Sequence, residues 1–262
     1  MKILNPDGKV NLHTHTKYCD GTDSPEELVC EAVKRGFSAL GFSGHEYSVY
    51  DGGFCMSRED TKRYRSEILD LKEKYRGQID IYLGIERDYF GEGDDYPYDY
   101  VIGSLHYTKA PGGGLLCVDE SEEGMVRNVT NFFGGDFRAY VESYYALIGA
   151  VAEKTHADII GHFDLITKFN EGGKYFDENA KWYKKAALRA LAQAAEKRPI
   201  FEINTGAVAR GYRSRPYPCG FLLEEIERLG CPVILSSDCH EKNKLDFGFN
   251  MVLDKVILDK LE

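Results

Sequence analysis

Short apolar runs alternate with longer segments of helical character along most of the chain. Runs of this length, bounded by polar or Gly residues, are typical of buried β-strands. Because they alternate with helical segments, the pattern predicts an α/β fold with a parallel sheet. The seven predicted strands cover residues 9–12, 39–43, 79–85, 100–105, 159–161, 200–203 and 233–235.

The segment that follows the first predicted strand has the clearest helix signal. Ser24 suits an N-cap, Pro25 fits the first helical position and Glu27 completes a capping box. Gly36 is expected to end this helix. Helical spacing of apolar residues, an Ala-rich stretch before Pro199 and a later Gly stop predict four further helices, over residues 57–75, 136–155, 179–198 and 221–229.

Chain length and composition favour a single domain. The chain has 262 residues, of which 43% are hydrophobic, and a single αβ barrel commonly uses about 250 residues. No internal repeat or low-complexity tail marks a boundary. The acidic, Tyr-rich segment 91–98 and the Gly run 110–114 are expected to be surface loops rather than linkers. We therefore expect one domain over residues 1–262.

Composition also limits the classes of partner. Pro6 and Asp7 precede any apolar stretch of signal-peptide length, and no later segment is long and apolar enough to span a membrane. The seven cysteines form no Cys-x-x-Cys pair, so we expect reduced thiols in a cytoplasmic protein. A formal net charge of −10 without basic clusters argues against polymeric nucleic acid as a partner. Bound metal ions could still let such a protein hold a small anion.

Most of the histidines follow the ends of predicted strands. In a closed βα barrel the carboxyl ends of the strands converge on one face, so side chains far apart in the sequence would share one cleft. A single His at a strand end is more often a hydrogen-bonded packing residue than a ligand, and one His-x-His pair is a weak signal. The joint pattern favours a metal site, because residues i and i+2 of an extended chain point the same way. The residues concerned are His13, His15, His45, Glu86, His106, His162, Asp238 and His240, whereas His156 lies within a helical segment and is expected to have no such role.

The order of these residues resembles the PHP (polymerase and histidinol phosphatase) superfamily. The resemblance covers nearly the whole chain, and its segments Gly161-His162-Phe163-Asp164 and Glu202-Ile203-Asn204-Thr205 are similar to those of the monofunctional histidinol phosphatases. It implies a distorted (β/α)7 barrel with a cluster of two or three divalent transition-metal ions at the carboxyl ends of the strands. The other matching motifs are His13-x-His15, Asp20, His45, Gly84-Ile85-Glu86, Ser104-Leu105-His106 and Asp238-x-His240.

The resemblance also implies a division of the ligands among the ions. Mixed nitrogen and oxygen ligands suit zinc, iron or manganese better than magnesium or calcium. The sequence does not choose among these three metals. By the resemblance, one ion would be held by His13, His15, Glu86 and Asp238, a second by Glu86, His106 and His162, and a third by Asp20, His45 and His240.

The implied activity is hydrolysis of a phosphate monoester, with L-histidinol phosphate of histidine biosynthesis as the leading substrate. Paired metal ions lower the pKa of bound water to about 7 and clamp the attacking and leaving oxygens of an in-line displacement. A hydroxide bridging two ions would attack phosphorus, and His240 and Asp20 are candidate proton donors to the leaving group. Three alternatives remain open: a PHP phosphoesterase acting on a nucleotide or other small phosphoester, a metal-binding interaction module without turnover, and an amidohydrolase on a similar barrel.

Four basic residues are candidate ligands for the phosphate. Lys168 follows His162 by six residues, at a position where histidinol phosphatases often carry a basic residue, and could contact phosphate as a point charge. Arg210, Arg213 and Arg215 lie together after the sixth predicted strand, and guanidinium groups suit forked phosphate contacts. A solvated basic loop is an equally good interpretation of this second segment.

Overall fold

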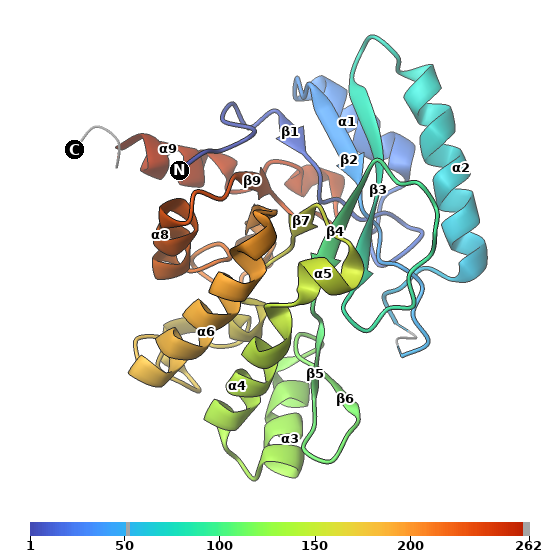
Figure 1. The fold of residues 1–262 in the computed structure, drawn as a ribbon. Helices are drawn as coiled ribbons and strands as arrows, with labels where there is room; N and C mark the ends of the chain where they lie inside the picture. Colours follow the sequence, from blue (N-terminus) through green and yellow to red (C-terminus); the bar gives the residue numbers. More distant parts are fainter. Residues whose placement is uncertain (51–52, 259–262) are drawn as a thin grey trace.

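Seven parallel strands form one curved sheet in the order β1-β2-β3-β4-β7-β8-β9 (Figure 1). The structure, a computed structural model, describes residues 1–50 and 53–258. Backbone hydrogen bonds between His13, His15 and Cys239 join β1 to β9 and bring the edges of the sheet together. The distorted (β/α)7 barrel is therefore confirmed. Its strands are β1 Val10–Asn11, β2 Ala39–Phe42, β3 Asp80–Asp88, β4 Tyr100–Ser104, β7 Ile159–Ile160, β8 Ile200–Asn204 and β9 Val233–Ser236.

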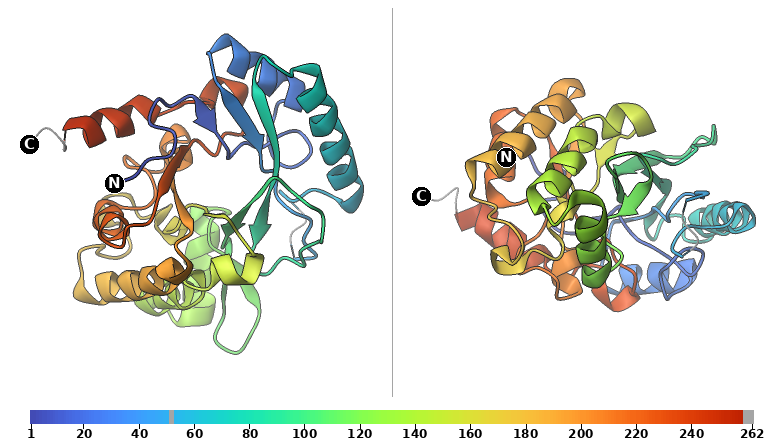
Figure 2. Two further views of the ribbon diagram at one scale, coloured as in Figure 1. Left: turned by 45° about the horizontal axis from the view of Figure 1, so that its top comes forward. Right: turned by 90° about the horizontal axis from the view of Figure 1, so that it is seen from below.

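The helices lie on the outside of the barrel, as Figure 2 shows. The capping box of the first helix is present, because the Ser24 side chain accepts from Glu27 N and the Glu27 side chain accepts from the Ser24 backbone. The predicted helix over 136–155 is wrong as one element: the chain bends after Gly149 and forms two helices. The departure from helical geometry is at Ala150, with φ −100° and ψ 5°. A Cβ on Gly149 would lie 2.9 Å from the Ala190 carbonyl, so Gly allows the neighbouring helix to pack closely beside this break. The helices that lie within the predicted ranges, to within one residue, are α1 Pro25–Lys34, α2 Arg58–Lys74, α4 Phe137–Ile148, α5 Val151–Thr155, α6 Lys181–Ala194 and α8 Gly220–Arg228.

Several elements were not predicted. The Gly run is the turn of a β-hairpin, β5 Tyr107–Lys109 with β6 Leu115–Cys117, and Gly112, Gly113 and Gly114 all have positive φ there. Only Gly adopts such a run of left-handed conformations at low cost. The next helix, α3, lies beside this hairpin (Figure 1). The remaining unpredicted helices are α3 Glu122–Phe133, α7 Gly206–Ala209 and α9 Phe249–Leu258.

Tyr100 packs in a small buried cluster with Ile102, Ile159 and Ile234. Tyr100 on β4 donates from its hydroxyl to the carbonyls of Leu12 and Phe42, at 2.5 and 3.1 Å. Its ring occupies space left by Gly41 and Gly84, where a Cβ would come within 2.4 and 2.3 Å of the Tyr100 side chain. This packing joins β1, β2, β3 and β4 and supports the strand ends that carry the site.

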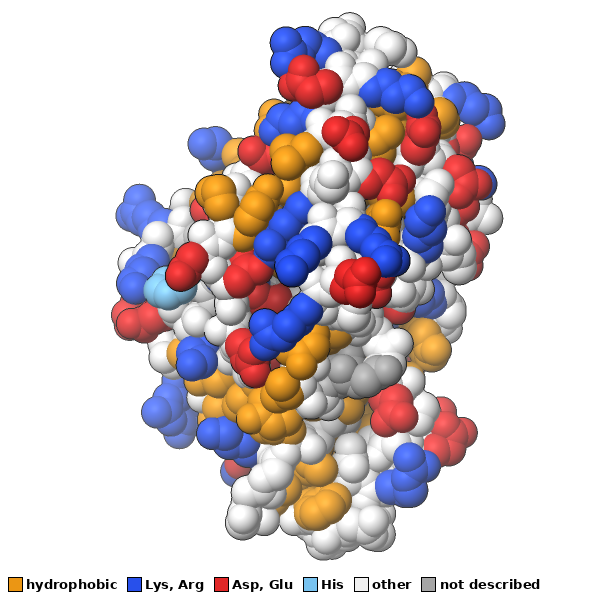
Figure 3. Space-filling view, turned by 90° about the vertical axis from the view of Figure 1, so that its right-hand side faces the viewer, with side chains coloured by type: hydrophobic (Ala, Val, Ile, Leu, Met, Phe, Trp, Pro, Cys, Tyr) orange, Lys and Arg blue, Asp and Glu red, His pale blue; other side chains and the backbone are white. Residues whose placement is uncertain are grey.

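Charges of both signs are mixed on the face that carries α2 (Figure 3). Lys72 pairs with Asp99 and Lys74 with Glu26 across neighbouring elements, at 2.8 and 2.5 Å. Exposed pairs of this kind contribute little to stability, typically about 0–1 kcal/mol each. Within the described residues, no helix is long and apolar enough to cross a membrane.

Candidate metal centre

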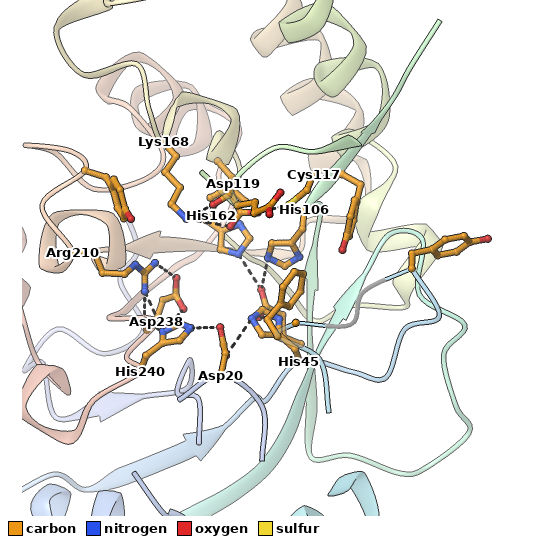
Figure 4. A pocket seen from close by; sticks show the side chains of 18 residues that line it. Asp20, His45, His106, Cys117, Asp119, His162, Lys168, Arg210, Asp238 and His240 are labelled. Atoms are coloured by element: carbon orange, nitrogen blue, oxygen red, sulfur yellow. Dashed lines mark hydrogen bonds and ion pairs between the residues drawn. The ribbon is translucent and has the colours of Figure 1, made fainter. Parts of the chain in front are cut away.

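The structure brings all nine predicted metal ligands to the carboxyl ends of the strands. Seven of them line a cavity of about 570 Å³, whose lining Figure 4 shows: Asp20, His45, Glu86, His106, His162, Asp238 and His240. The other two, His13 and His15, follow β1 and are fully buried beside Glu86. The backbone of His45 bridges that of Glu86 on β3. Asp20 belongs to the loop after β1 and is the most exposed carboxylate of the group, at 28% of its side chain.

Glu86 is the central residue of this centre. It is buried, and its Oε2 lies 2.9 Å from His45 Nδ1 and 3.3 Å from His13 Nε2. Its Oε1 lies 3.0 Å from His162 Nε2 and 3.5 Å from His106 Nε2. Its Oε2 also lies 3.5 Å from His15 Nε2. One carboxylate thus faces five imidazoles, as a ligand shared between neighbouring ions would.

A second carboxylate gathers the imidazoles on the outer side of the centre. Asp20 lies 3.0 Å from His240 Nε2, 3.5 Å from His15 Nδ1 and 3.8 Å from His45 Nε2. Asp238 approaches from β9, with Oδ1 at 3.2 Å from His15 Nε2. This side of the centre is therefore closed by residues that come from the two ends of the chain.

The donor atoms fit metal ions. Three of them, His13 Nε2, His15 Nε2 and Glu86 Oε2, are buried and make no hydrogen bond. Buried polar atoms are nearly always paired, so unpaired atoms that face one another indicate a place for a cation. Four groups have donor atoms close enough to share an ion: His13, Glu86 and His162; His13, His15 and Asp238; His45, Glu86 and His106; and His15, Asp20, His45 and His240.

These groups differ in detail from the ligand sets that the family resemblance implied. His15 joins the group of Asp20, and His45 also joins the group of Glu86 and His106. Imidazoles that stand between two groups cannot be assigned to one ion from spacing along the chain. The three-dimensional arrangement is needed because each ring offers two nitrogens that point in different directions.

Supporting carboxylates behind the ligands were not predicted as site residues. Glu202 on β8 is buried and accepts from His13 Nδ1 at 2.6 Å, from the His162 backbone at 2.8 Å and from Ser236 Oγ at 2.7 Å. A carboxylate on Nδ1 keeps Nε2 free of a proton and aimed at the centre. The Glu202-Ile203-Asn204-Thr205 segment carried a sequence signal for the family but none for this contact.

His106 is held in the same way. Asp88 Oδ2 at the end of β3 accepts from the His106 backbone at 2.8 Å and lies 3.2 Å from its Nδ1. Ser104 donates to Glu86 Oε1 at 2.5 Å. Both supporting residues lie near a ligand in sequence, so periodicity alone could have placed them at the strand ends.

The charges of the centre depend on one another. Burial by itself lowers the pKa of His106, but Glu86 and Asp88 outweigh it and raise the pKa to about 10. Burial and the neighbouring imidazoles of His240 and His45 lower the pKa of His15 to about 3. Burial would raise the pKa of Glu86, yet the surrounding histidines bring it well below its ordinary value. Carboxylates at the centre are therefore charged, and they attract cations.

Comparison with known proteins gives the family. The model of the PHP domain matches residues 11–206. The chain belongs to the PHP domain family. A protein of Deinococcus radiodurans described as "Probable histidinol-phosphatase" is 30% identical over 257 residues, covering 92% of this chain and 90% of that protein. The "Histidinol-phosphatase" of Bacillus subtilis is 25% identical over 273 residues, covering 93% and 97%.

Solved structures share the fold of this PHP domain. A structure of a candidate histidinol phosphatase from Listeria monocytogenes has a TM-score of 0.79 at 22% identity and covers 93% of this chain and 99% of its own. Histidinol phosphate phosphatase from Lactococcus lactis, complexed with zinc, L-histidinol and phosphate, has a TM-score of 0.65 at 20% identity and covers 97% and 93%. At these identities the likeness is one of fold.

Two of the four predicted phosphate ligands line the cavity of the PHP domain. Lys168 reaches it from the segment after β7, and Arg210 from the end of α7 (Figure 4). Arg210 donates to Asp238 Oδ2 and to the Asp238 carbonyl, both at 3.0 Å, and lies 3.1 Å from His240 Nδ1. Its guanidinium therefore holds a candidate metal ligand while it borders the cavity.

The structure places the other two arginines away from the cavity. Arg213 is buried and donates to both carboxylate oxygens of Glu178, at 2.9 and 3.0 Å, and to the Thr167 carbonyl. Arg215 is exposed and does not line the cavity. These positions do not support the hypothesis that the two arginines bind phosphate. The Arg213 guanidinium is already bonded to Glu178, and Arg215 faces solvent. His156, expected to have no site role, ends α5 in a left-handed conformation.

Proposed function

We propose that this PHP domain is a metal-dependent phosphate-monoester hydrolase that converts L-histidinol phosphate to L-histidinol and phosphate, a reaction of histidine biosynthesis. The observation that carries the proposal is the meeting of nine competent ligand residues in one cluster, seven of which line one cavity. Similarity over nine-tenths of the chain to proteins named histidinol-phosphatase supports the choice of substrate.

We propose two or three divalent ions for this centre, of zinc, iron or manganese. Bound divalent ions would supply an acidic water and positive charge for the phosphate oxygens. The mixed imidazole and carboxylate donors favour these metals over magnesium and calcium. The Lactococcus lactis protein of the same fold holds zinc together with L-histidinol and phosphate, which makes zinc the first metal to test.

The chain itself contributes binding and proton transfer. Lys168 and Arg210 border the cavity beside the ligands, and they would contact phosphate oxygens. Asp20 and His240 form a hydrogen-bonded pair at 3.0 Å on its more open side. This pair stays our candidate for passing a proton to the leaving alkoxide, since the other imidazoles are more deeply buried.

Release of phosphate tests the proposal. Metal-analysed protein is given L-histidinol phosphate, a nucleoside monophosphate or p-nitrophenyl phosphate, with and without a chelator. The expected result is chelator-sensitive hydrolysis with a strong preference for L-histidinol phosphate, restored when zinc, iron or manganese is added back. Preference for the nucleotide would replace this substrate by another phosphoester, and no hydrolysis by metal-loaded protein would refute the assignment as a phosphatase.

A further inference from the structure

An ion pair lies on the wall of the cavity beside the candidate metal ligands. Lys168 Nζ donates to the backbone carbonyl of Asp119 at 2.7 Å and lies 3.4 Å from its Oδ2. Figure 4 shows the two side chains directed toward one another next to His106 and His162. Both are only slightly exposed, at 12% for Lys168 and 21% for Asp119. The carboxylate is therefore close to where a phosphate would sit.

The hairpin fixes Asp119 at this position. β5 begins directly after His106, and the chain returns along β6 so that Val118 N donates to the His106 carbonyl at 2.9 Å. Asp119 is the next residue, just before the N-cap of α3 at Ser121. Its backbone is thus held against a candidate ligand by the hairpin, independently of Lys168.

Few carboxylates of the cavity are free to bind substrate. Among the described lining residues, Asp20, Glu86 and Asp238 are candidate metal ligands, which leaves Asp119 and Glu120. Glu120 is exposed, whereas Asp119 lies among imidazoles and faces inward. Burial would raise the pKa of Asp119, but Lys168, His106 and His162 lower it, so the side chain stays ionised.

We propose that Asp119 is a specificity residue that binds the ammonium group of an amino-alcohol phosphate. On binding, Lys168 turns from Asp119 to the phosphate, and the substrate's ammonium takes its place at the carboxylate. Lys168 has a flexible stem, and its Nζ already lies 5.1 Å from the Tyr212 ring centroid at the cavity wall. The exchange keeps every charge paired, which matters in a site of low solvent access.

This inference rests on the proposed function and adds a reason for its selectivity. In an amino-alcohol phosphate the ammonium sits one carbon beyond the ester carbon, so phosphate and ammonium need neighbouring partners of opposite charge. Asp119 and Lys168 are such neighbours. Glycerol phosphate has a hydroxyl in place of the ammonium, so it would leave the Asp119 carboxylate without a cation.

Asp119→Asn tests the proposal, because it preserves the shape of the side chain and removes its charge. The ratio of kcat/KM for L-histidinol phosphate to that for glycerol phosphate should fall roughly tenfold to a hundredfold, mainly through KM, as expected for a lost hydrogen bond to a charged group. Asp119→Glu should recover part of the ratio. Glu123→Gln, which removes an exposed carboxylate on α3 outside this cavity, should leave the ratio at the wild-type value.

A binding measurement keeps the test independent of turnover. Calorimetry on metal-loaded protein gives the dissociation constants of phosphoethanolamine and glycerol phosphate, and Asp119→Asn should weaken the first roughly tenfold more than the second. Equal weakening of both would show that Asp119 acts only by holding Lys168, and would overturn the proposal. If the wild-type protein fails to hydrolyse L-histidinol phosphate, the proposed function falls, while this comparison still decides the role of Asp119.

Discussion

Glu202 lies behind His13, and replacing it with Gln should weaken metal binding without changing any ligand atom. Its Oε1 accepts from His13 Nδ1 and Ser236 Oγ, and its Oε2 accepts from the His162 backbone and Asn204 Nδ2. Every partner is a donor, so a carboxylate satisfies all of them. An amide cannot, because its NH₂ group must face two donors whichever way it is turned.

Both orientations of the amide disturb a candidate ligand. With NH₂ toward His13, the ring must accept at Nδ1 and carry its proton on Nε2, where it cannot bind metal. With NH₂ toward His162, a buried backbone N–H loses its acceptor. Asn204 cannot adapt freely, since its Oδ1 already accepts from Gly206 N at 2.8 Å.

The size of the effect follows from these contacts. An unsatisfied buried donor costs about 1–3 kcal/mol. Loss of a supporting partner of a metal-bound His typically weakens metal affinity about 10- to 100-fold, which corresponds to about 1.4–2.7 kcal/mol. The two estimates agree, so we expect Glu202→Gln to raise the dissociation constant of the most tightly held zinc by that factor.

Competition with a chromogenic zinc chelator measures this affinity. Thermal unfolding of metal-free and zinc-loaded protein separates metal binding from stability. Glu224→Gln, at an exposed position of α8, serves as the control. If Glu202→Gln binds zinc within twofold of wild type, or if it lowers the melting temperature equally with and without zinc, the supporting role is refuted.

The remaining predictions concern Lys168, which lines the cavity, and Arg213 and Arg215, which do not. In steady-state kinetics, Lys168→Ala should raise KM for a phosphate monoester about tenfold or more, whereas Lys168→Arg should retain most of the affinity. An unchanged KM in Lys168→Ala would contradict phosphate binding. Arg213→Ala should destabilise the fold by about 3 kcal/mol, because it leaves Glu178 half-buried without its partner. Arg215→Ala should change stability by no more than about 0.5 kcal/mol. Denaturant unfolding distinguishes the two variants, and equal stabilities would show that the Arg213 pair contributes nothing.

The barrel itself could be predicted from the sequence. Seven short apolar runs alternating with helices indicated parallel strands, and the ligand residues were found because they follow those runs. The alternation can be recognised locally, because strand and helix periodicities depend on residues that are close together in the sequence. The hairpin around the Gly run was missed because its strands have only three residues each. The helix α3 was missed although Met125, Val129 and Phe133 recur at helical spacing and Ser121 and Gly134 are ordinary cap residues.

The sequence by itself determined the strand ends and the residue types that meet there, because parallel strands in a closed barrel must bring their carboxyl ends together. Only the tertiary structure decided how those residues are used. Arg210 and Arg213 are three positions apart, yet one borders the cavity and the other is buried against Glu178. Glu202 contacts His13 and Asp119 contacts Lys168, and both partners are distant in the sequence. Such contacts depend on how the elements pack, which the spacing of residues along the chain does not show.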